Sequence, residues 1–257
     1  MIYMAGDLHL IRYIWREKQE LDGDSYRALH AMVDAIVKDK TNEKKLLLLA
    51  GDNFDRNRID GRTLDEFTKA VDKLSDNDVM VAFVQGQHDR NDPPHAQVQG
   101  AVWLHNRTIT FDDRKIAGLD WHCRDDLHEA LKNVPECDIL VMHQSFEHMI
   151  GYGMAADLEL ADVPKHVKNI LVGDIHVQEL QEHRKGWCLS PGPLHPCNIS
   201  QGGQKCFWKL SYGSNKPEGV FIPTRPIWRI RATEDATLTE MFESEVDIKG
   251  SSLAPIV

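Results

Sequence analysis

Aspartate and histidine side chains come directly after five short apolar runs of the chain, where they could bind metal ions. These polar segments are Gly6-Asp7-Leu8-His9, Gly51-Asp52-Asn53-Phe54-Asp55, Gly86-Gln87-His88-Asp89, His143-Gln144 and Gly173-Asp174-Ile175-His176. Ligands of open α/β sheets bind outside the carboxyl ends of the strands, so we expect these side chains to converge on one spot. Carboxylates combined with imidazoles are typical of transition-metal sites, and an aspartate that bridges two ions is common in two-metal centres.

Each of these residues also has a simpler interpretation. A single aspartate after glycine is most often a turn residue or a helix N-cap. A single histidine after a strand is more often a hydrogen-bonded core or surface residue than a ligand. Five such segments at five predicted strand ends are much harder to explain in this way, and we therefore favour the metal site.

The apolar runs predict the elements that position these side chains. Short, continuous apolar segments predict buried strands, and apolar residues at helical spacing predict amphipathic helices between them. The predicted strands are 1–5, 46–50, 79–84, 115–119, 139–142 and 169–172, and the predicted helices are 25–38, 63–74 and 125–133. This alternation indicates an α/β fold in which helices cover both sheet faces. Later runs at 207–210, 220–222 and 227–230 predict antiparallel strands that close a sheet.

Composition restricts the class of protein. The 257 residues are 42% hydrophobic and 27% charged, which excludes a fully disordered chain. Five scattered cysteines and an N-terminus without a basic leader favour a reduced, cytoplasmic protein, and no apolar run is long enough to cross a membrane. The net charge of −10 gives no overall attraction to nucleic acid. Binding of DNA would therefore need a local basic strip, bound metal cations or a partner subunit.

The order of the five segments resembles the calcineurin-like metallophosphoesterases, over residues 1 to about 200. Within that superfamily the chain is most similar to the SbcD-like nucleases of double-strand-break repair. The matching features are Asp7-Leu8-His9-Leu10, the GDNFD segment from Gly51, Val141-Met142-His143-Gln144 and the Pro-Gly turn at Pro191-Gly192. The resemblance implies a four-layer α-β-β-α sandwich of two mixed sheets flanked by helices. We expect this domain to span residues 1–232, with an acidic tail or short partner-binding segment at 233–257.

The same resemblance implies a role for each site residue. Asp7, His9 and His176 would hold the first metal, and Asp52 would bridge the two ions. Gln87, His143 and Asp174 fall at the positions of the second metal. His88 falls where the family has a histidine that contacts the scissile phosphate, and Asp89 would orient it. Arg56, Arg58 and Tyr152 lie where they could contact substrate, although solvated loops explain the two arginines equally well.

Two residues depart from the family pattern, which has Asn at the position of Gln87 and His at the position of Asp174. Both changes affect the second metal, which is either retuned or lost. Gln87 keeps an amide oxygen on a longer side chain, and Asp174 supplies a harder, charged oxygen. We favour a retuned site.

The function implied by the resemblance is a DNA exo- or endonuclease that uses two Mn²⁺ ions, or Mg²⁺ or another divalent metal, in DNA repair, recombination or replication. Its implied partners are DNA, an SbcC-like coiled-coil ATPase and a second copy of the chain, with no membrane. A phosphodiesterase or phosphatase for nucleotides or phosphoproteins is the alternative, and the acidic net charge favours it. A scaffold with the same fold and a degenerate site is a further alternative, against which the complete first-metal set argues.

Overall fold

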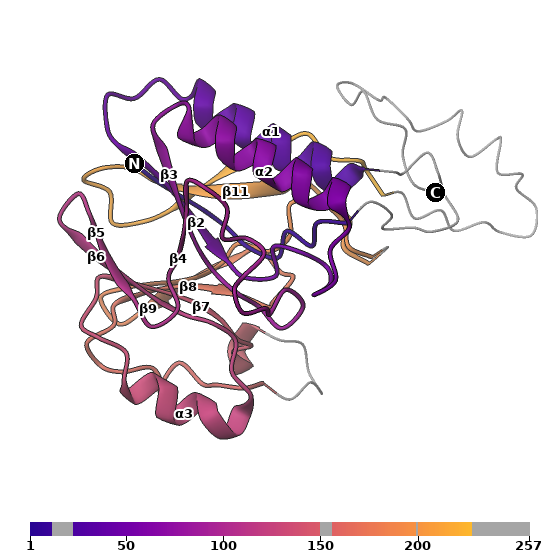
Figure 1. Ribbon diagram of the computed structural model, residues 1–257. Helices are drawn as coiled ribbons and strands as arrows, with labels where there is room; N and C mark the ends of the chain where they lie inside the picture. Colours follow the sequence, from indigo (N-terminus) through magenta and orange to yellow (C-terminus); the bar gives the residue numbers. More distant parts are fainter. Residues whose placement is uncertain (12–22, 150–155, 199, 228–257) are drawn as a thin grey trace, which may run out of the picture.

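Two six-stranded β-sheets lie face to face in the computed structural model (Figure 1). The structure describes residues 1–11, 23–149, 156–198 and 200–227. In spatial order, the first sheet consists of β12 (Glu218–Ile222), β11 (Lys205–Leu210), β1 (Ile2–Ala5), β2 (Lys45–Ala50), β3 (Val79–Val84) and β4 (Ala101–Trp103). The second sheet consists of β5 (Thr108–Phe111), β6 (Arg114–Leu119), β7 (Ile139–His143), β8 (Asn169–Gly173), β10 (Gly186–Ser190) and β9 (Glu179–His183).

Both sheets are mixed. Strands β1 to β4 run parallel to one another, and β11 and β12 continue the first sheet in antiparallel pairs. In the second sheet β6, β7, β8 and β10 are parallel, while β5 and β9 are antiparallel edge strands. The polar segments therefore follow the parallel strands of each sheet.

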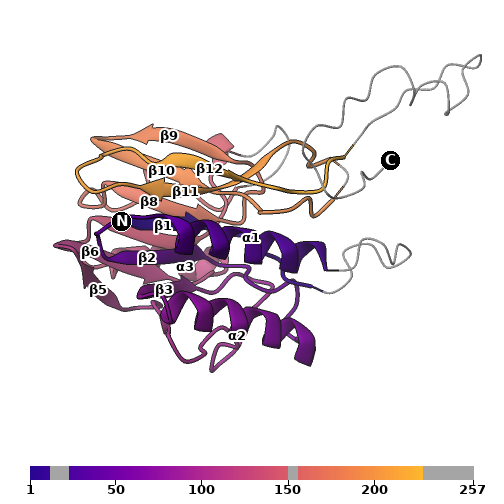
Figure 2. The same cartoon turned by 90° about the horizontal axis from the view of Figure 1, so that it is seen from above.

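In the described part of the chain, three α-helices cover the outer faces of the two sheets. Helices α1 (Asp24–Lys38) and α2 (Gly61–Ser75) lie side by side on the first sheet (Figure 2), and α3 (Arg124–Lys132) lies on the second (Figure 1). A 3₁₀ turn, η2 (Glu147–Met149), follows β7. Helix α2 begins after Asp60, whose carboxylate accepts a hydrogen bond from the Thr63 backbone N–H at 3.0 Å.

Alternate residues of each strand divide into separate cores. In β2, Leu47 and Leu49 face the helices, whereas Leu46 and Leu48 pack between the sheets against residues such as Leu171. Because both faces are buried, the strand needs an apolar residue at every position, and this explains the unbroken Leu46–Leu49 run. The inner faces of the two sheets thus form one shared core.

The expected α-β-β-α sandwich is confirmed, and the predicted helices and parallel strands lie within one or two residues of the observed ones. The expectation that helices cover both faces of one sheet is wrong, because each sheet has helices on its outer face only. Strands β4, β5, β9 and β10 were not predicted. Strands β4 and β5 have only three and four residues, β9 is mostly polar, and the apolar run of β10 is only Trp187-Cys188-Leu189. The segment 227–230 lies almost entirely outside the described residues, as does 233–257.

Gly118 of β6 marks a close approach between the two sheets. Its N–H donates to the Arg107 carbonyl, its carbonyl accepts from the Asn106 N–H, and a Cβ at this position would overlap Leu104 Cβ and lie 2.8 Å from the Leu104 carbonyl oxygen. The segment that leaves β4 can therefore pair with β6 only where β6 has no side chain.

We predict that Gly118→Ala lowers the free energy of unfolding by about 1–3 kcal/mol, the usual cost of forcing extra volume into a packed core. Urea denaturation measures this change. Gly61→Ala is the matched control, because no atom lies within 4 Å of a Cβ at the start of α2. That variant should be as stable as the wild type or slightly more stable. Equal stability of the two variants would contradict the proposed contact.

Candidate metal centre

The loops after β1, β2, β3, β7 and β8 meet at one edge of the two sheets. There the structure brings together three overlapping groups of side chains, and within each group the ligand atoms all lie within 4.8 Å of one another. The groups are Asp7, His9 and His176; His9, Asp52 and His88; and Asp7, Asp52 and His143. Most of the side chains expected at the site therefore do converge.

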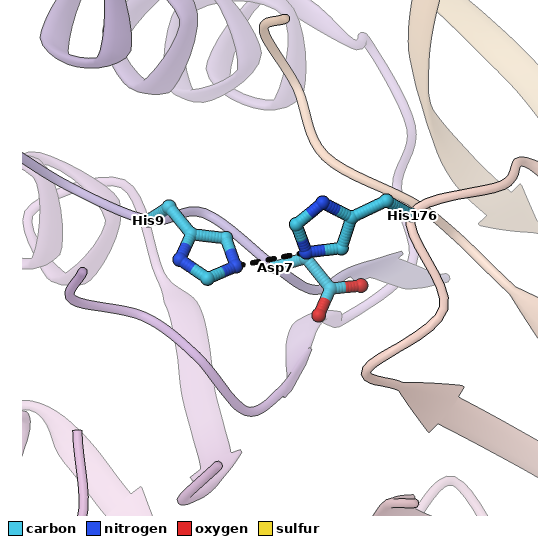
Figure 3. Close-up of side chains that lie close together, drawn as sticks. All are labelled: Asp7, His9 and His176. Atoms are coloured by element: carbon cyan, nitrogen blue, oxygen red, sulfur yellow. Dashed lines mark hydrogen bonds between the residues drawn. The ribbon is translucent and has the colours of Figure 1, made fainter. Parts of the chain in front are cut away.

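The first group lies on two loops that approach each other across the sheets (Figure 3). His9 Nε2 is 3.0 Å from His176 Nε2, with the two nitrogens facing each other beside the Asp7 carboxylate. The loop after β1 is held to the loop after β2, because the Asp7 N–H donates to the Gly51 carbonyl and the His9 N–H to the Asp52 carbonyl. Backbone pairing thus fixes the positions of two candidate ligands.

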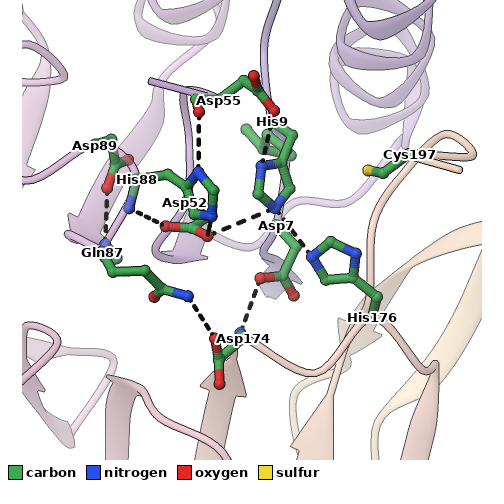
Figure 4. Close-up of polar contacts among 12 residues, drawn as sticks. Asp7, His9, Asp52, Asp55, Gln87, His88, Asp89, Asp174, His176 and Cys197 are labelled. Atoms are coloured by element: carbon green, nitrogen blue, oxygen red, sulfur yellow. Dashed lines mark hydrogen bonds and ion pairs between the residues drawn. The ribbon is translucent and has the colours of Figure 1, made fainter. Parts of the chain in front are cut away.

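Asp52 lies at the centre of the cluster (Figure 4). Its Oδ2 is 3.5 Å from His9 Nε2 and 3.5 Å from His143 Nε2, while its Oδ1 accepts a hydrogen bond from the His88 backbone N–H at 3.0 Å. The side chain is 1% exposed. One carboxylate therefore contacts side chains from both sheets, as a bridging ligand would.

Two buried atoms of the cluster have no hydrogen-bond partner among the described residues: Asp7 Oδ2 and His143 Nε2. Unpaired buried polar atoms are costly, and a carboxylate oxygen and an imidazole nitrogen that face the same space are both good ligands for a divalent cation. The donor set therefore fits a metal ion. Asp7, His9, Asp52, His143 and His176 are the residues that would hold it.

The electrostatics of the cluster agree with this assignment. Burial raises the pKa of Asp7 to about 6. Burial also opposes ionisation of Asp52, but the adjacent His143 outweighs it and lowers the pKa of Asp52 to about 2. Conversely, Asp52 overcomes the effect of burial on His143 and raises its pKa to about 10. The buried carboxylates thus favour positive charge at His143, and a bound cation would supply that charge instead.

Gln87 and Asp174, the two residues that depart from the family pattern, contact each other at the margin of the cluster. Gln87 Nε2 donates to Asp174 Oδ1 at 2.6 Å, and the same oxygen lies 3.8 Å from His143 Nε2. The Asp174 N–H donates to Asp7 Oδ1 at 2.8 Å. Asp174 is close to the centre but belongs to none of the three groups.

His88 is the most exposed member of the cluster, with 47% of its side chain accessible. Its Nδ1 is 3.0 Å from the Asp55 carbonyl oxygen, so this nitrogen carries a proton and Nε2 faces the cluster, 3.9 Å from Asp52 Oδ2. Asp89, which we expected to orient His88, is hydrogen-bonded to the backbone around the ring and to Asn53. The buried Asp89 carboxylate accepts these hydrogen bonds from Asn53 and from the Gly86 N–H, and so fixes the loop that carries His88.

The three residues that we expected to contact substrate lie outside the three ligand groups. Arg56 is exposed and its Nε lies 3.3 Å from Asp55 Oδ2, while Arg58 is exposed on the same loop. Tyr152 lies outside the described residues.

Four residues near the site were not predicted. Asp55 Oδ1 lies 3.5 Å from His9 Nδ1, and Asn53 binds Asp89 as described above. The buried His195 donates to the Leu8 carbonyl at 2.9 Å, and Gln201 Nε2 lies 2.8 Å from His176 Nδ1. Asp55 and Asn53 belong to the GDNFD segment and could have been found there. Only the folded chain brings His195 and Gln201 back to the site.

Comparison with known proteins identifies the family. The family model described as calcineurin-like phosphoesterase matches residues 1–178. This protein belongs to that family. It is 24% identical over 262 aligned positions to the DNA double-strand break repair protein Mre11 of Nanoarchaeum equitans, covering 87% of this chain and 68% of that protein. The solved structure of TT1561 of Thermus thermophilus has the same fold, with a TM-score of 0.56, 13% identity and coverage of 86% and 97% of the two chains.

These matches confirm the resemblance to the calcineurin-like metallophosphoesterases, with an Mre11 relative that agrees with the SbcD-like branch. The chain is a hydrolase of phosphoesters that depends on divalent metal. Among the described residues, no helix combines the length and hydropathy needed to cross a bilayer.

We predict that a divalent cation raises the melting temperature and that EDTA reverses the rise. A ligand that binds only the folded state at 100 times its Kd adds about 2.7 kcal/mol of stability. Asp52→Ala should abolish the shift, since Asp52 contacts both halves of the cluster. His88→Ala should keep it, since His88 lies at the rim. Differential scanning fluorimetry measures the melting temperatures, and elemental analysis measures the metal content. Loss of metal from the His88 variant would contradict the assignment of His88 to the rim and not to the metal ligands.

Proposed function

We propose that this protein is a DNA nuclease that hydrolyses phosphodiester bonds at a centre of two divalent ions, with Mn²⁺ as the preferred metal. The observation that carries the proposal is the buried carboxylate–imidazole cluster with one exposed histidine, His88, at its rim. The Mre11 relative, a DNA double-strand break repair protein by name, supports DNA as the substrate. A metal ion, when bound, would polarise the phosphoryl oxygen and lower the pKa of a bound water.

The residues of this chain would have two roles, to hold the metal ions and to transfer a proton. Asp7, His9 and His176 would form the first site and Asp52 the bridge. His143 would join Asp174 and Gln87 in the second site. Because the Asp55 carbonyl accepts from His88 Nδ1, the protonated ring can donate from Nε2 to the leaving oxygen as the ester bond breaks.

We further propose that the protein acts in DNA repair, recombination or replication in the cytoplasm, with an SbcC-like coiled-coil ATPase and as a homodimer. The net charge of −10 is consistent with a need for partners or metal cations in DNA binding. The boundary proposed at residue 232 leaves 233–257 as an acidic tail or a short partner-binding segment.

We predict that the purified protein hydrolyses single- or double-stranded DNA with Mn²⁺, more slowly with Mg²⁺, and not with EDTA. Gel analysis of labelled oligonucleotides measures this, beside assays of a chromogenic phosphodiester, nucleotides and a phosphopeptide. If nucleotides or the phosphopeptide are hydrolysed while DNA stays uncleaved, the result would favour the nucleotide phosphodiesterase or phosphatase instead. Metal-loaded protein that leaves every substrate intact would favour the scaffold.

His88→Ala should reduce kcat for DNA by about 10²–10⁴-fold, the usual contribution of a general acid or base. Metal content should stay at the wild-type level, because the buried ligands remain. His128→Ala, which removes an exposed histidine of α3, is the matched control and should leave kcat unchanged. A His88 variant with wild-type turnover would refute the assigned role.

If Asp174 is a retuned ligand of the second metal, calorimetric titration should show one tight and one weak Mn²⁺ site. Asp174→Ala should weaken only the second. Asp174→His should restore the family ligand at this one position and increase the relative affinity for Zn²⁺, since imidazole is a softer donor than carboxylate. An Asp174→Ala variant that still binds two Mn²⁺ ions with unchanged affinities would contradict the assignment.

A further inference from the structure

A hollow of about 850 Å³ lies outside the metal cluster, between α3 and the β5–β6 edge of the second sheet. Apolar side chains of β6, β7 and α3 line part of it. Besides Thr108, its polar lining consists of Arg90, Asn106, His122, Asp126, Glu129 and Asn133. The "α3 hollow", defined by these six residues, has a volume within the range of small-molecule sites.

Aromatic rings are stacked beside the hollow. The Trp103 and His105 rings stack with centroids 5.7 Å apart and planes 20° apart, and the His105 and His122 centroids are 5.5 Å apart. The Arg90 guanidinium lies 6.0 Å from the centroid of the Trp121 ring. Trp121 and His122 are partly exposed, so they offer aromatic surface to a ligand, and Arg90 adds a positive charge beside them.

Hydrogen bonds join the segment that carries Trp121 and His122, after β6, to two loops that carry site residues. Arg90 follows His88 by two residues, and the Trp121 N–H donates to the Gln85 carbonyl at 2.9 Å. The His122 N–H donates to Gln144 Oε1 at 2.7 Å, directly after His143 in the chain. A polymeric substrate bound at His88 would therefore pass close to the hollow.

The chemistry of the lining favours a nucleobase over a phosphate group. Asp126 and Glu129 would repel a phosphate, whereas their oxygens can accept hydrogen bonds from the exocyclic amino group of cytosine or adenine. Asn106 and Asn133 add amide donors and acceptors, and the apolar lining suits the faces of a base. Among the charged residues of the lining, Arg90 is the one suited to the phosphate that accompanies the base.

We propose that the α3 hollow binds an unpaired base of the DNA strand whose phosphate lies at His88, with the Arg90–Trp121 pair and His122 stacking against it. Base stacking on aromatic side chains tolerates different sequences and is strong enough to select single strands over duplex. This inference rests on the proposed nuclease function, because it assumes a nucleic-acid substrate. It adds that the substrate has an unpaired nucleotide next to the cleaved bond.

Binding can be separated from hydrolysis by measuring it in the His88→Ala background, which should keep its metal ions while turnover falls. Fluorescence anisotropy with labelled dC12 and with a 12-base-pair blunt duplex should show tighter binding of the single strand. His122→Ala removes a ring, and Asn133→Trp fills the hollow. Each should weaken dC12 binding on the order of tenfold. Lys69→Gln, which removes an exposed charge from α2, is the control and should bind dC12 like His88→Ala alone.

A second measurement locates the base directly. Oligonucleotides with 5-iodo-deoxycytidine at single positions should photocrosslink to peptides that contain Trp103, Trp121 or His122. With Mn²⁺ and an intact His88, both variants should hydrolyse bis(p-nitrophenyl) phosphate at the wild-type rate, because this small diester does not reach the hollow. That rate also shows that the variants are folded.

The outcomes distinguish the two proposals. If the wild type cleaves DNA but both variants bind dC12 normally, or if crosslinks form only elsewhere, the α3 hollow does not bind a base and the nuclease function stands. If the wild type hydrolyses the small diester but neither binds nor cleaves DNA, the nuclease function itself fails. Weakened binding in both variants together with crosslinks at the rings would support the inference.

Discussion

The hydrogen bond between the His143 ring and the Ala50 carbonyl joins the two sheets at the edge where the whole site is built. Nδ1 lies 2.7 Å from this oxygen. Because a carbonyl can only accept, Nδ1 carries the proton and Nε2 is left to face Asp52, as a metal-binding histidine requires. The contact demands two glycines, since a Cβ on either Gly51 or Gly173 would lie 2.5 Å from Nδ1. The glycines of two motifs thus leave the space that the histidine of a third motif occupies.

The loops around this contact are strained in a way that the packing must offset. Asp7, His9, Asp52 and Asp174 all have positive φ, of 50°, 39°, 46° and 89°. Such conformations cost roughly 1–3 kcal/mol each for residues other than glycine, and they persist only where the surroundings enforce them. Here the backbone hydrogen bonds between the loops after β1 and β2 do so. The strain turns four side chains toward one point, which an unstrained strand end would not do.

Sequence patterns predicted the parts of the molecule that depend on local chemistry. Continuous apolar runs identified β1, β2, β3, β7 and β8, and the polar residues after them identified the cluster. Contacts between residues that are distant in the sequence, and the directions in which side chains turn, were not predictable. Spacing cannot show that Asp89 turns to Asn53 rather than His88, or that Gln201 returns to His176. Strand β4, which has only three residues, and the mostly polar strand β9 were missed because they are defined by their neighbours in the sheet and not by a pattern of their own.

The difference in exposure between His88 and the buried cluster reflects their different chemical tasks. Groups that hold a cation gain from burial, because a low dielectric strengthens their attraction to it. A group that passes a proton to a leaving oxygen must instead meet the substrate at the surface. Asp55 connects the two, since its carboxylate contacts His9 and its carbonyl accepts from His88. The position of the proton donor is therefore tied to the position of a metal ligand through one residue, and a shift of either would move the other.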